Sequence, residues 1–221
     1  MTIAISGASG QLGRIAIESL KTRVDAKQIV ALARDTARVA DLGVAARTFD
    51  YTRPETMAAA LDGVEVLALI SSSDFENRVG QHENVITAAK AAGVGRVIYT
   101  SILKADQSPL MIAQDHKATE EILKASGLSY TMLRNPWYIE NWTASLPIAV
   151  AQGAMIGATG GAKCGSSLLA SCSSPRSSCP DHTFARNAQV ERTNALALGP
   201  RNREVEGQQD PTCATICFHR N

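Results

Sequence analysis

Residues 1–162 of this 221-residue chain contain no cysteine, and aromatic residues make up only 5% of the sequence. A disulfide framework is therefore excluded from this part, and the absence of Cys-x-x-Cys or clustered histidines argues against a metal site. No apolar run approaches the roughly 20 residues of a membrane span, so no membrane partner is expected. The formal net charge of +1, without a basic run, argues against nucleic acid as a partner.

The first residues, Met1 to Ser6, lack the basic segment of a secretory signal peptide, which predicts a cytoplasmic location. The length fits one domain or one and a half. Because 45% of the residues are hydrophobic, a packed core is expected and global disorder is not.

Apolar runs and helical patterns alternate through residues 1–160. The runs at residues 2–6, 28–33, 44–49, 64–70, 96–100 and 129–134 predict six strands. Helical spacing between them predicts helices at residues 11–20, 53–63, 77–92 and 112–126. Nearly all-apolar strands are typical of a parallel sheet covered on both faces. The predicted fold class is therefore α/β, a doubly wound parallel sheet of the Rossmann type over residues 1–160.

A glycine-rich turn, Gly-Ala-Ser-Gly-Gln-Leu-Gly, follows the first strand and opens the first helix. Gly7 permits the tight turn, Gly10 lets the backbone approach a pyrophosphate, and Gly13 lets the helix pack close to the strand. The helix N-terminus offers free N–H groups and a positive dipole end to phosphate. Because the dinucleotide fingerprint requires this context, the turn predicts an NAD(P) site.

Arg34 ends the second predicted strand, 21 residues past Gly13. A carboxylate at this place would hold the ribose 2′-hydroxyl of NAD, whereas arginine accommodates the 2′-phosphate of NADP. The guanidinium therefore favours NADP, and the adjacent Asp35 leaves NAD open as the alternative.

Three serines, Ser71, Ser72 and Ser73, follow the fourth predicted strand. Ligands of an open α/β sheet lie beyond the carboxyl ends of its strands. Small hydroxyl residues there would let ribose and nicotinamide approach closely, and they also suit a helix cap. Asp50 and Tyr51 close the third strand, where an adenine site and a structural loop fit equally well.

Six stretches are informative in combination: GASGQLG (7–13), QIVALAR (28–34), LISSS (69–73), QHENVITAAKAAG (81–93), YTSIL (99–103) and YTMLRNPWYIEN (130–141). Together they resemble the NmrA-like group of atypical short-chain dehydrogenases. Within it, the chain is most similar to the bacterial NAD(P)H:quinone oxidoreductase 2 type, which is close to triphenylmethane reductase. The resemblance covers about residues 2–160.

The resemblance implies a fold that binds NADPH and supports two-electron reduction of quinones. It implies cofactor contacts at Gly7, Ala8, Ser9, Gly10, Gln11, Leu12, Arg34, Ser71, Ser72, Ser73, Asn135 and Tyr138. Pro136 stands where glycine is expected in relatives, so the backbone near the nicotinamide is expected to differ.

The Tyr-x-x-x-Lys motif of typical short-chain dehydrogenases does not occur, since Tyr99 and Lys104 are five residues apart at a strand end. Carbonyl–alcohol chemistry, which needs that proton relay, is therefore disfavoured. Quinone reduction mainly requires that the ring be held against the nicotinamide. His116 is the candidate catalytic proton donor, because histidine titrates near pH 6.5, and a surface or capping role is its alternative. Trp137 and Tyr138 fit either an aromatic substrate slot or the core.

The last 59 residues differ in composition, with all five cysteines and seven serines among the thirteen residues from Ser166 to Ser178. They show no sustained helical or strand period, so residues 161–221 are predicted to form a low-order tail. Alanine codons of GC-rich DNA, read one base out of phase, give serine, cysteine, arginine and proline. We therefore interpret the tail as the product of a frameshift near codon 160. A disulfide-bonded or metal-binding appendage is the alternative, which an odd cysteine count and a cytoplasmic setting disfavour.

Three functions compete at this point. The first is an NADPH-dependent enzyme that transfers hydride to a quinone or a similar flat acceptor, and LISSS and LRNPWY favour it. The second is an NmrA-type redox sensor that binds NADP(H) without turnover, and the third is an inactive fragment. The expected partner is a small-molecule quinone, a homodimer is left open, and His82 is assigned a structural role.

Overall fold

The computed structural model describes residues 1–143, 146–153, 166–167 and 189–192. The six predicted strands are confirmed as β1 (Ile3–Ile5), β2 (Ile29–Ala33), β3 (Ala45–Thr48), β4 (Val66–Leu69), β5 (Arg96–Ile102) and β6 (Ser129–Asn135). They pair in parallel in the order β3-β2-β1-β4-β5-β6. This is the strand order of a doubly wound dinucleotide-binding sheet.

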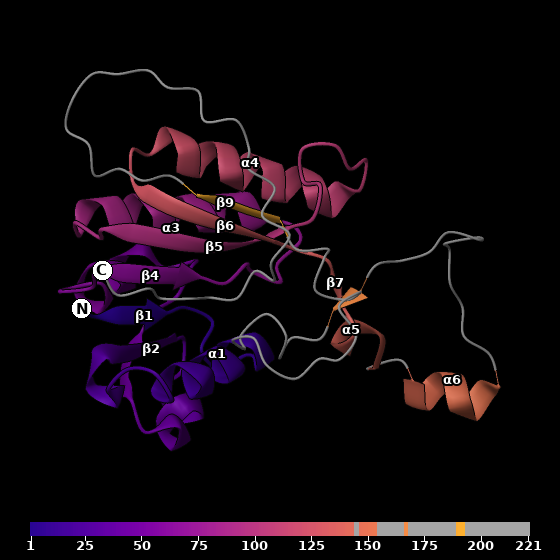
Figure 1. The fold of residues 1–221 in the computed structure, drawn as a ribbon, viewed down its shortest axis with the longest axis horizontal. Helices are drawn as coiled ribbons and strands as arrows, with labels where there is room; N and C mark the ends of the chain where they lie inside the picture. Colours follow the sequence, from indigo (N-terminus) through magenta and orange to yellow (C-terminus); the bar gives the residue numbers. More distant parts are fainter. Residues whose placement is uncertain (144–145, 154–165, 168–188, 193–221) are drawn as a thin grey trace.

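Strand β9 (Gln189–Arg192) adds an antiparallel edge beside β6 (Figure 1), and β8 (Ser166–Ser167) pairs with β7 (Trp137–Tyr138). Neither β8 nor β9 was predicted from the sequence. All five cysteines and the predicted boundary between residues 160 and 161 lie outside the described residues. The interpretation of the tail as a frameshift product therefore stays a prediction.

The four predicted helices are present, one with a corrected length, and two further short helices that were not predicted follow them. They are α1 (Gln11–Lys21), α2 (Met57–Ala60), α3 (Arg78–Ala91), α4 (Met111–Ala125), α5 (Glu140–Thr143) and α6 (Leu146–Gln152), with 3₁₀ turns η1 (Ala26–Gln28), η2 (Thr36–Leu42) and η3 (Pro54–Thr56). The helix predicted for residues 53–63 is wrong in length: a 3₁₀ turn begins at Pro54 and α2 ends at Ala60. Gly63, with φ of +68°, then reverses the chain into the approach to β4.

Two hydrophobic layers sandwich the sheet because successive strand residues point to opposite faces. Ala4 and Leu67 pack with Val85 of α3 and Leu123 of α4 on one face; on the other, neighbouring strand residues pack with Ile17 of α1. Figure 1 shows α3 and α4 beside the β4–β6 part of the sheet and α1 beside β1 and β2. Coverage on both faces is what the nearly all-apolar strands predicted.

The chain leaves β1 toward β2 on one side of the sheet, whereas β4 pairs with β1 on its other side. The strand order thus reverses between β1 and β4, and ligands of open α/β sheets bind beyond the carboxyl ends at such a point. Within the described residues, none of the helices has the length and apolar character needed to cross a membrane. The same residues contain no cluster of three metal-ligating side chains.

Candidate functional site

The glycine turn lies at the carboxyl end of β1 and is fixed by backbone contacts. Gly7 has φ of +61°, a conformation that favours glycine, and its carbonyl oxygen accepts the Gly10 N–H at 3.0 Å. The Ala8 N–H donates to the Leu32 carbonyl oxygen of β2 at 3.1 Å. A Cβ on Gly13 would lie 2.4 Å from the Gly7 carbonyl oxygen, which is far inside contact distance. The turn and the first turn of α1 therefore touch through backbone alone.

The N-terminus of α1 has no side-chain cap, which leaves its first backbone N–H groups available to a phosphate. Its N-cap is Gly10, which is exposed and gives no side-chain hydrogen bond to the helix. Gln11 is exposed and Ser9 is half-buried, whereas the side chains of Ala8 and Leu12 are buried. Leu12 can therefore offer a ligand its backbone N–H, whereas the Ala8 N–H already donates to Leu32. Uncapped N–H groups and the helix dipole together suit an anion.

The structure brings the segment after β6 onto the start of α1. Leu12 packs against Ile70, which follows β4, and against Tyr138 of β7. The amide nitrogen of Asn135 donates to the Tyr138 hydroxyl at 2.9 Å. Asn135 is itself buried. Its predicted contact with the cofactor is therefore limited to the small part of its surface that its neighbours do not cover. Two of the predicted stretches, at Leu12 and at Asn135 and Tyr138, thus meet at the start of α1.

Arg34 is exposed directly after β2, beside the glycine turn that β2 anchors. The carboxylate of Asp35 accepts the Ala37 N–H at 3.0 Å and caps η2. That carboxylate is therefore engaged in a local cap, and the argument from Asp35 for NAD loses force. Arg34 remains the predicted contact for a 2′-phosphate.

The serine turn after β4 is held by many hydrogen bonds. The Ser71 N–H donates to the Thr100 hydroxyl at 2.9 Å, and the Ser72 N–H donates to Nε2 of His82 at 2.9 Å. The Ser72 hydroxyl donates to the side-chain oxygen of Gln81 at 2.6 Å. Ser71 and Ser72 are half-buried and Ser73 is exposed, so the turn borders the open end of the sheet.

Tyr51 has a structural role, and the adenine alternative at this position gains no support. Its hydroxyl lies 2.5 Å from the Ser6 hydroxyl and donates to the Ile70 carbonyl oxygen at 2.8 Å. Burial raises the pKa of the Tyr51 phenol, so it stays protonated. Tyr51 thus links Ser6, which follows β1, to Ile70, which follows β4.

His116 lies on α4 with only 6% of its surface exposed. Its Nδ1 is 2.7 Å from the hydroxyl of Tyr99, which is fully buried in β5. Burial, helped by the positive charge of Arg78, lowers the pKa of His116 to about 4. The unperturbed pKa near 6.5 on which the proton-donor prediction rested does not apply to the folded protein. At neutral pH the ring is uncharged and suits hydrogen-bond donation better than proton release.

Two buried neutral histidines should make the fold less stable in mild acid. Burial lowers the pKa of His82 to about 3 and that of His116 to about 4. Below pH 6.5 the unfolded chain therefore binds more protons than the folded one, and the free energy of unfolding falls as pH drops. Between pH 6.5 and 5 we expect a loss of about 1–2 kcal/mol for each histidine.

Urea unfolding at a series of pH values would measure this slope. The His82→Gln variant should show a shallower slope than the wild-type protein, because one of the two groups is removed. Equal slopes in the two proteins would contradict the assignment of His82 as a buried neutral group.

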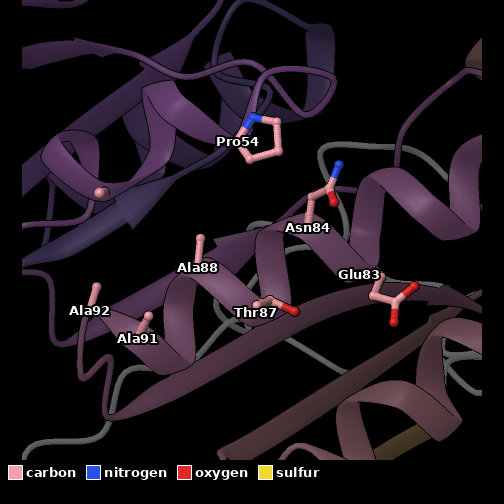
Figure 2. A pocket seen from close by; sticks show the side chains of 8 residues that line it. Pro54, Glu83, Asn84, Thr87, Ala88, Ala91 and Ala92 are labelled. Atoms are coloured by element: carbon pink, nitrogen blue, oxygen red, sulfur yellow. The ribbon is translucent and has the colours of Figure 1, made fainter.

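A separate hollow lies between α3 and the η3–α2 segment (Figure 2). It is lined by Pro54, Ala58, Glu83, Asn84, Thr87, Ala88, Ala91 and Ala92. None of the predicted cofactor or catalytic residues borders it. We therefore do not assign this hollow to the dinucleotide.

Sequence reasoning missed the buried residues that support the serine turn. Arg78, Gln81 and Thr119 are all buried, and Arg78 and Gln81 contact Ser72 directly. Arg78 and Gln81 stand at the start of a helix, where charged and polar side chains are usually solvated. They support the serine turn only because the strand order brings α3 beside the end of β4.

Comparison with known proteins places these features in a family. A family model described as NAD(P)H-binding matches residues 7–160. Quinone oxidoreductase 2 of Escherichia coli (strain K12) is 51% identical over 171 residues, covering 76% of this chain and 60% of that protein. The solved structure of the E. coli NADPH-dependent quinone oxidoreductase complexed with NADPH has a TM-score of 0.74 and 50% identity, covering 77% of this chain and 61% of that chain.

The structure of Citrobacter sp. triphenylmethane reductase complexed with NADP(H) has a TM-score of 0.72 and 34% identity, covering 77% of this chain and 62% of that chain. This chain thus spans about 60% of the length of its curated relative. The predicted fold class and the predicted resemblance are confirmed by these matches. With the family match running through more than half of its length, the chain belongs to the NAD(P)H-binding, NmrA-like family.

Proposed function

We propose that this chain binds NADPH and directs hydride transfer to a quinone. The observation that carries the proposal is the 51% identity to quinone oxidoreductase 2. The cofactor assignment is supported independently by the backbone cradle at Gly13, which a side chain would fill. The absence of Tyr-x-x-x-Lys fits an acceptor whose reduction needs no dedicated proton relay.

Each part of the site has a distinct role in this proposal. The uncapped N-terminus of α1 and the Gly7 turn receive the pyrophosphate. Arg34 pairs with the 2′-phosphate through its guanidinium. The Ser71–Ser73 turn borders the ribose and nicotinamide, and Tyr138 closes the site from the side of α1.

When bound, NADPH supplies the hydride, that is, one proton and two electrons. The quinone takes up this hydride and one solvent proton to give the hydroquinone, and NADP⁺ is released. Burial lowers the pKa of His116 to about 4, so at neutral pH its ring would be uncharged and would offer the quinone oxygen a hydrogen bond. The chain therefore acts mainly by holding two rings against each other.

Absorbance of reduced nicotinamide, followed with the full chain and a simple benzoquinone, tests the reaction. We expect a decrease that requires both the quinone and the protein. A flat trace together with tight NADPH binding would favour the redox sensor instead. A protein that does not bind NADPH at about 1 mM has a binding free energy weaker than about −4 kcal/mol. This result would overturn both functions.

Replacing Arg34 by alanine should weaken NADPH binding and leave NADH binding almost unchanged. Hydrogen bonds to charged groups contribute about 1.5–3 kcal/mol, which corresponds to about a tenfold to hundredfold loss of NADPH affinity. Fluorescence titration with each cofactor measures the two affinities. Lys90→Ala is the matched control, because it removes the same charge from the last turn of α3. Equal losses for NADPH and NADH would contradict a 2′-phosphate contact at Arg34.

A further inference from the structure

A closed ring of hydrogen bonds joins the serine turn to two helices. On one arm, the Ser72 N–H donates to Nε2 of His82, whose Nδ1 is 2.9 Å from the Thr119 hydroxyl on α4. The Thr119 hydroxyl donates to the Asp115 carbonyl oxygen at 2.9 Å. On the other arm, Nε of Arg78 donates to the Ser72 carbonyl oxygen at 2.8 Å, and its Nη1 is 3.2 Å from the Asp115 carboxylate.

The chemistry of these groups gives His82 a single tautomer. A backbone N–H can only donate, so Nε2 of His82 must accept from Ser72 and carries no proton. The ring is neutral, because burial keeps its pKa far below neutrality. Its one proton is therefore on Nδ1 and is donated to Thr119, whose own hydroxyl proton is used at Asp115.

The side chains that link the Ser72 turn to Asp115 are buried, whereas Ser72 and Asp115 themselves are half-buried. His82 and Thr119 are 0% exposed and Arg78 is 3% exposed, while Ser72 is half-buried at the open end of the sheet. Polar groups in such a core lose hydration and are tolerated only when every hydrogen bond is made. An apolar helix contact would pack α3 on β5 equally well, but it could not orient the peptide groups of Ser72.

The ring also reaches the other half of the site. Asp115, where both arms meet, directly precedes His116 on α4. Ser72 and His116 come from different elements, and the ring through α3 links the Ser72 turn to the segment of α4 that carries His116. Sites that align two reacting groups depend on this kind of support.

We propose that His82 and Thr119 are positioning residues that hold the Ser72 turn, and through it the nicotinamide end of the cofactor, in register with α4. This inference rests on the proposed function, since it assigns the turn to the cofactor. The ring contributes no group to the substrate. Its effect is on cofactor affinity and on the alignment of the turn.

Thr119→Val tests the proposal, because valine keeps the shape of threonine and removes the acceptor for His82. We expect NADPH affinity to fall about tenfold, the equivalent of one hydrogen bond. Exchange of the Ser72 amide hydrogen, measured by NMR on the full chain, should become about tenfold faster, while that of Ile5 in β1 keeps its wild-type rate. Thr119→Ser retains the hydroxyl and should restore both values.

The outcomes separate the ring from the proposed function. If the ring has only a structural role, the amide hydrogens of Ser72 and Ile5 should both exchange faster in folded Thr119→Val, and NADPH affinity should not change. That result would overturn the inference. Wild-type protein that does not bind NADPH would overturn the proposed function and the cofactor role of the ring, while Ser72 exchange would still report the ring itself. If Thr119→Val does not fold, His82→Gln, which removes the imidazole link between Ser72 and Thr119, must reduce NADPH affinity in the same direction.

Discussion

Arg134→Met is expected to lower the free energy of unfolding by about 3–5 kcal/mol, because it leaves a carboxylate buried without its cation. Arg134 is 5% exposed and Glu120 is 2% exposed. Their side chains form two parallel hydrogen bonds, of 2.9 Å from Nε and 2.6 Å from Nη2. The Ser101 hydroxyl donates to the same carboxylate at 2.6 Å, so β5, β6 and α4 meet at one buried charge.

A second substitution shows whether the unmatched charge causes the loss. Arg134→Met combined with Glu120→Gln removes the charge but keeps an oxygen for Ser101, so it should recover much of the stability. Urea unfolding of the two variants and of the Glu120→Gln single variant measures the coupling. Arg53→Met is the matched control, because Arg53 and its partner Glu55 are both 64% exposed and such a pair contributes about 0–1 kcal/mol. Equal losses in the single and double Arg134 variants would contradict the argument.

The parts of this molecule that the sequence predicted are those with local signals. Apolar runs predict strands, and their alternation with helices predicts parallel pairing. Neither signal depends on residues that are distant in the sequence. The Gly7 turn is also local, since a positive φ and a close backbone approach need glycine within seven residues. The helix at residues 53–63 was predicted too long because Gly63 resembles a helix stop, whereas α2 ends at Ala60 and residues 61–63, with Gly63 at φ of +68°, form a separate turn.

The support of the site could not be predicted, because it depends on contacts that are distant in the sequence. His82 and Thr119 are 37 residues apart, and so are Arg78 and Asp115. From the sequence alone, a histidine or an arginine on a helix gives the same pattern whether its side chain faces solvent or a neighbouring turn. The unperturbed pKa of histidine does not describe His116 for the same reason, since burial by surrounding elements lowers its pKa to about 4.

Gly13→Ala is expected to reduce both stability and NADPH affinity, although alanine is the better helix former. The added Cβ would lie 2.4 Å from the Gly7 carbonyl oxygen and 2.8 Å from Cα of Ala8, and both are backbone atoms that cannot rotate away. Helix α1 would have to move off the glycine turn, at a cost of about 1–3 kcal/mol. Because the movement carries the uncapped N–H groups away from the phosphates, we expect about a hundredfold weaker NADPH binding.

Gly80→Ala on α3 is the matched control, because it makes the same change in a helix with the opposite expected result. Its Cβ would meet the side chain of Asn77, whose oxygen would lie 2.6 Å away, and that exposed side chain can rotate. Without a backbone clash, the better helix propensity of alanine should raise stability by up to about 1 kcal/mol. Thermal unfolding and NADPH titration of both variants distinguish the two glycines. If Gly13→Ala matched Gly80→Ala in both measurements, close contact between α1 and the turn would not be what positions the phosphate site.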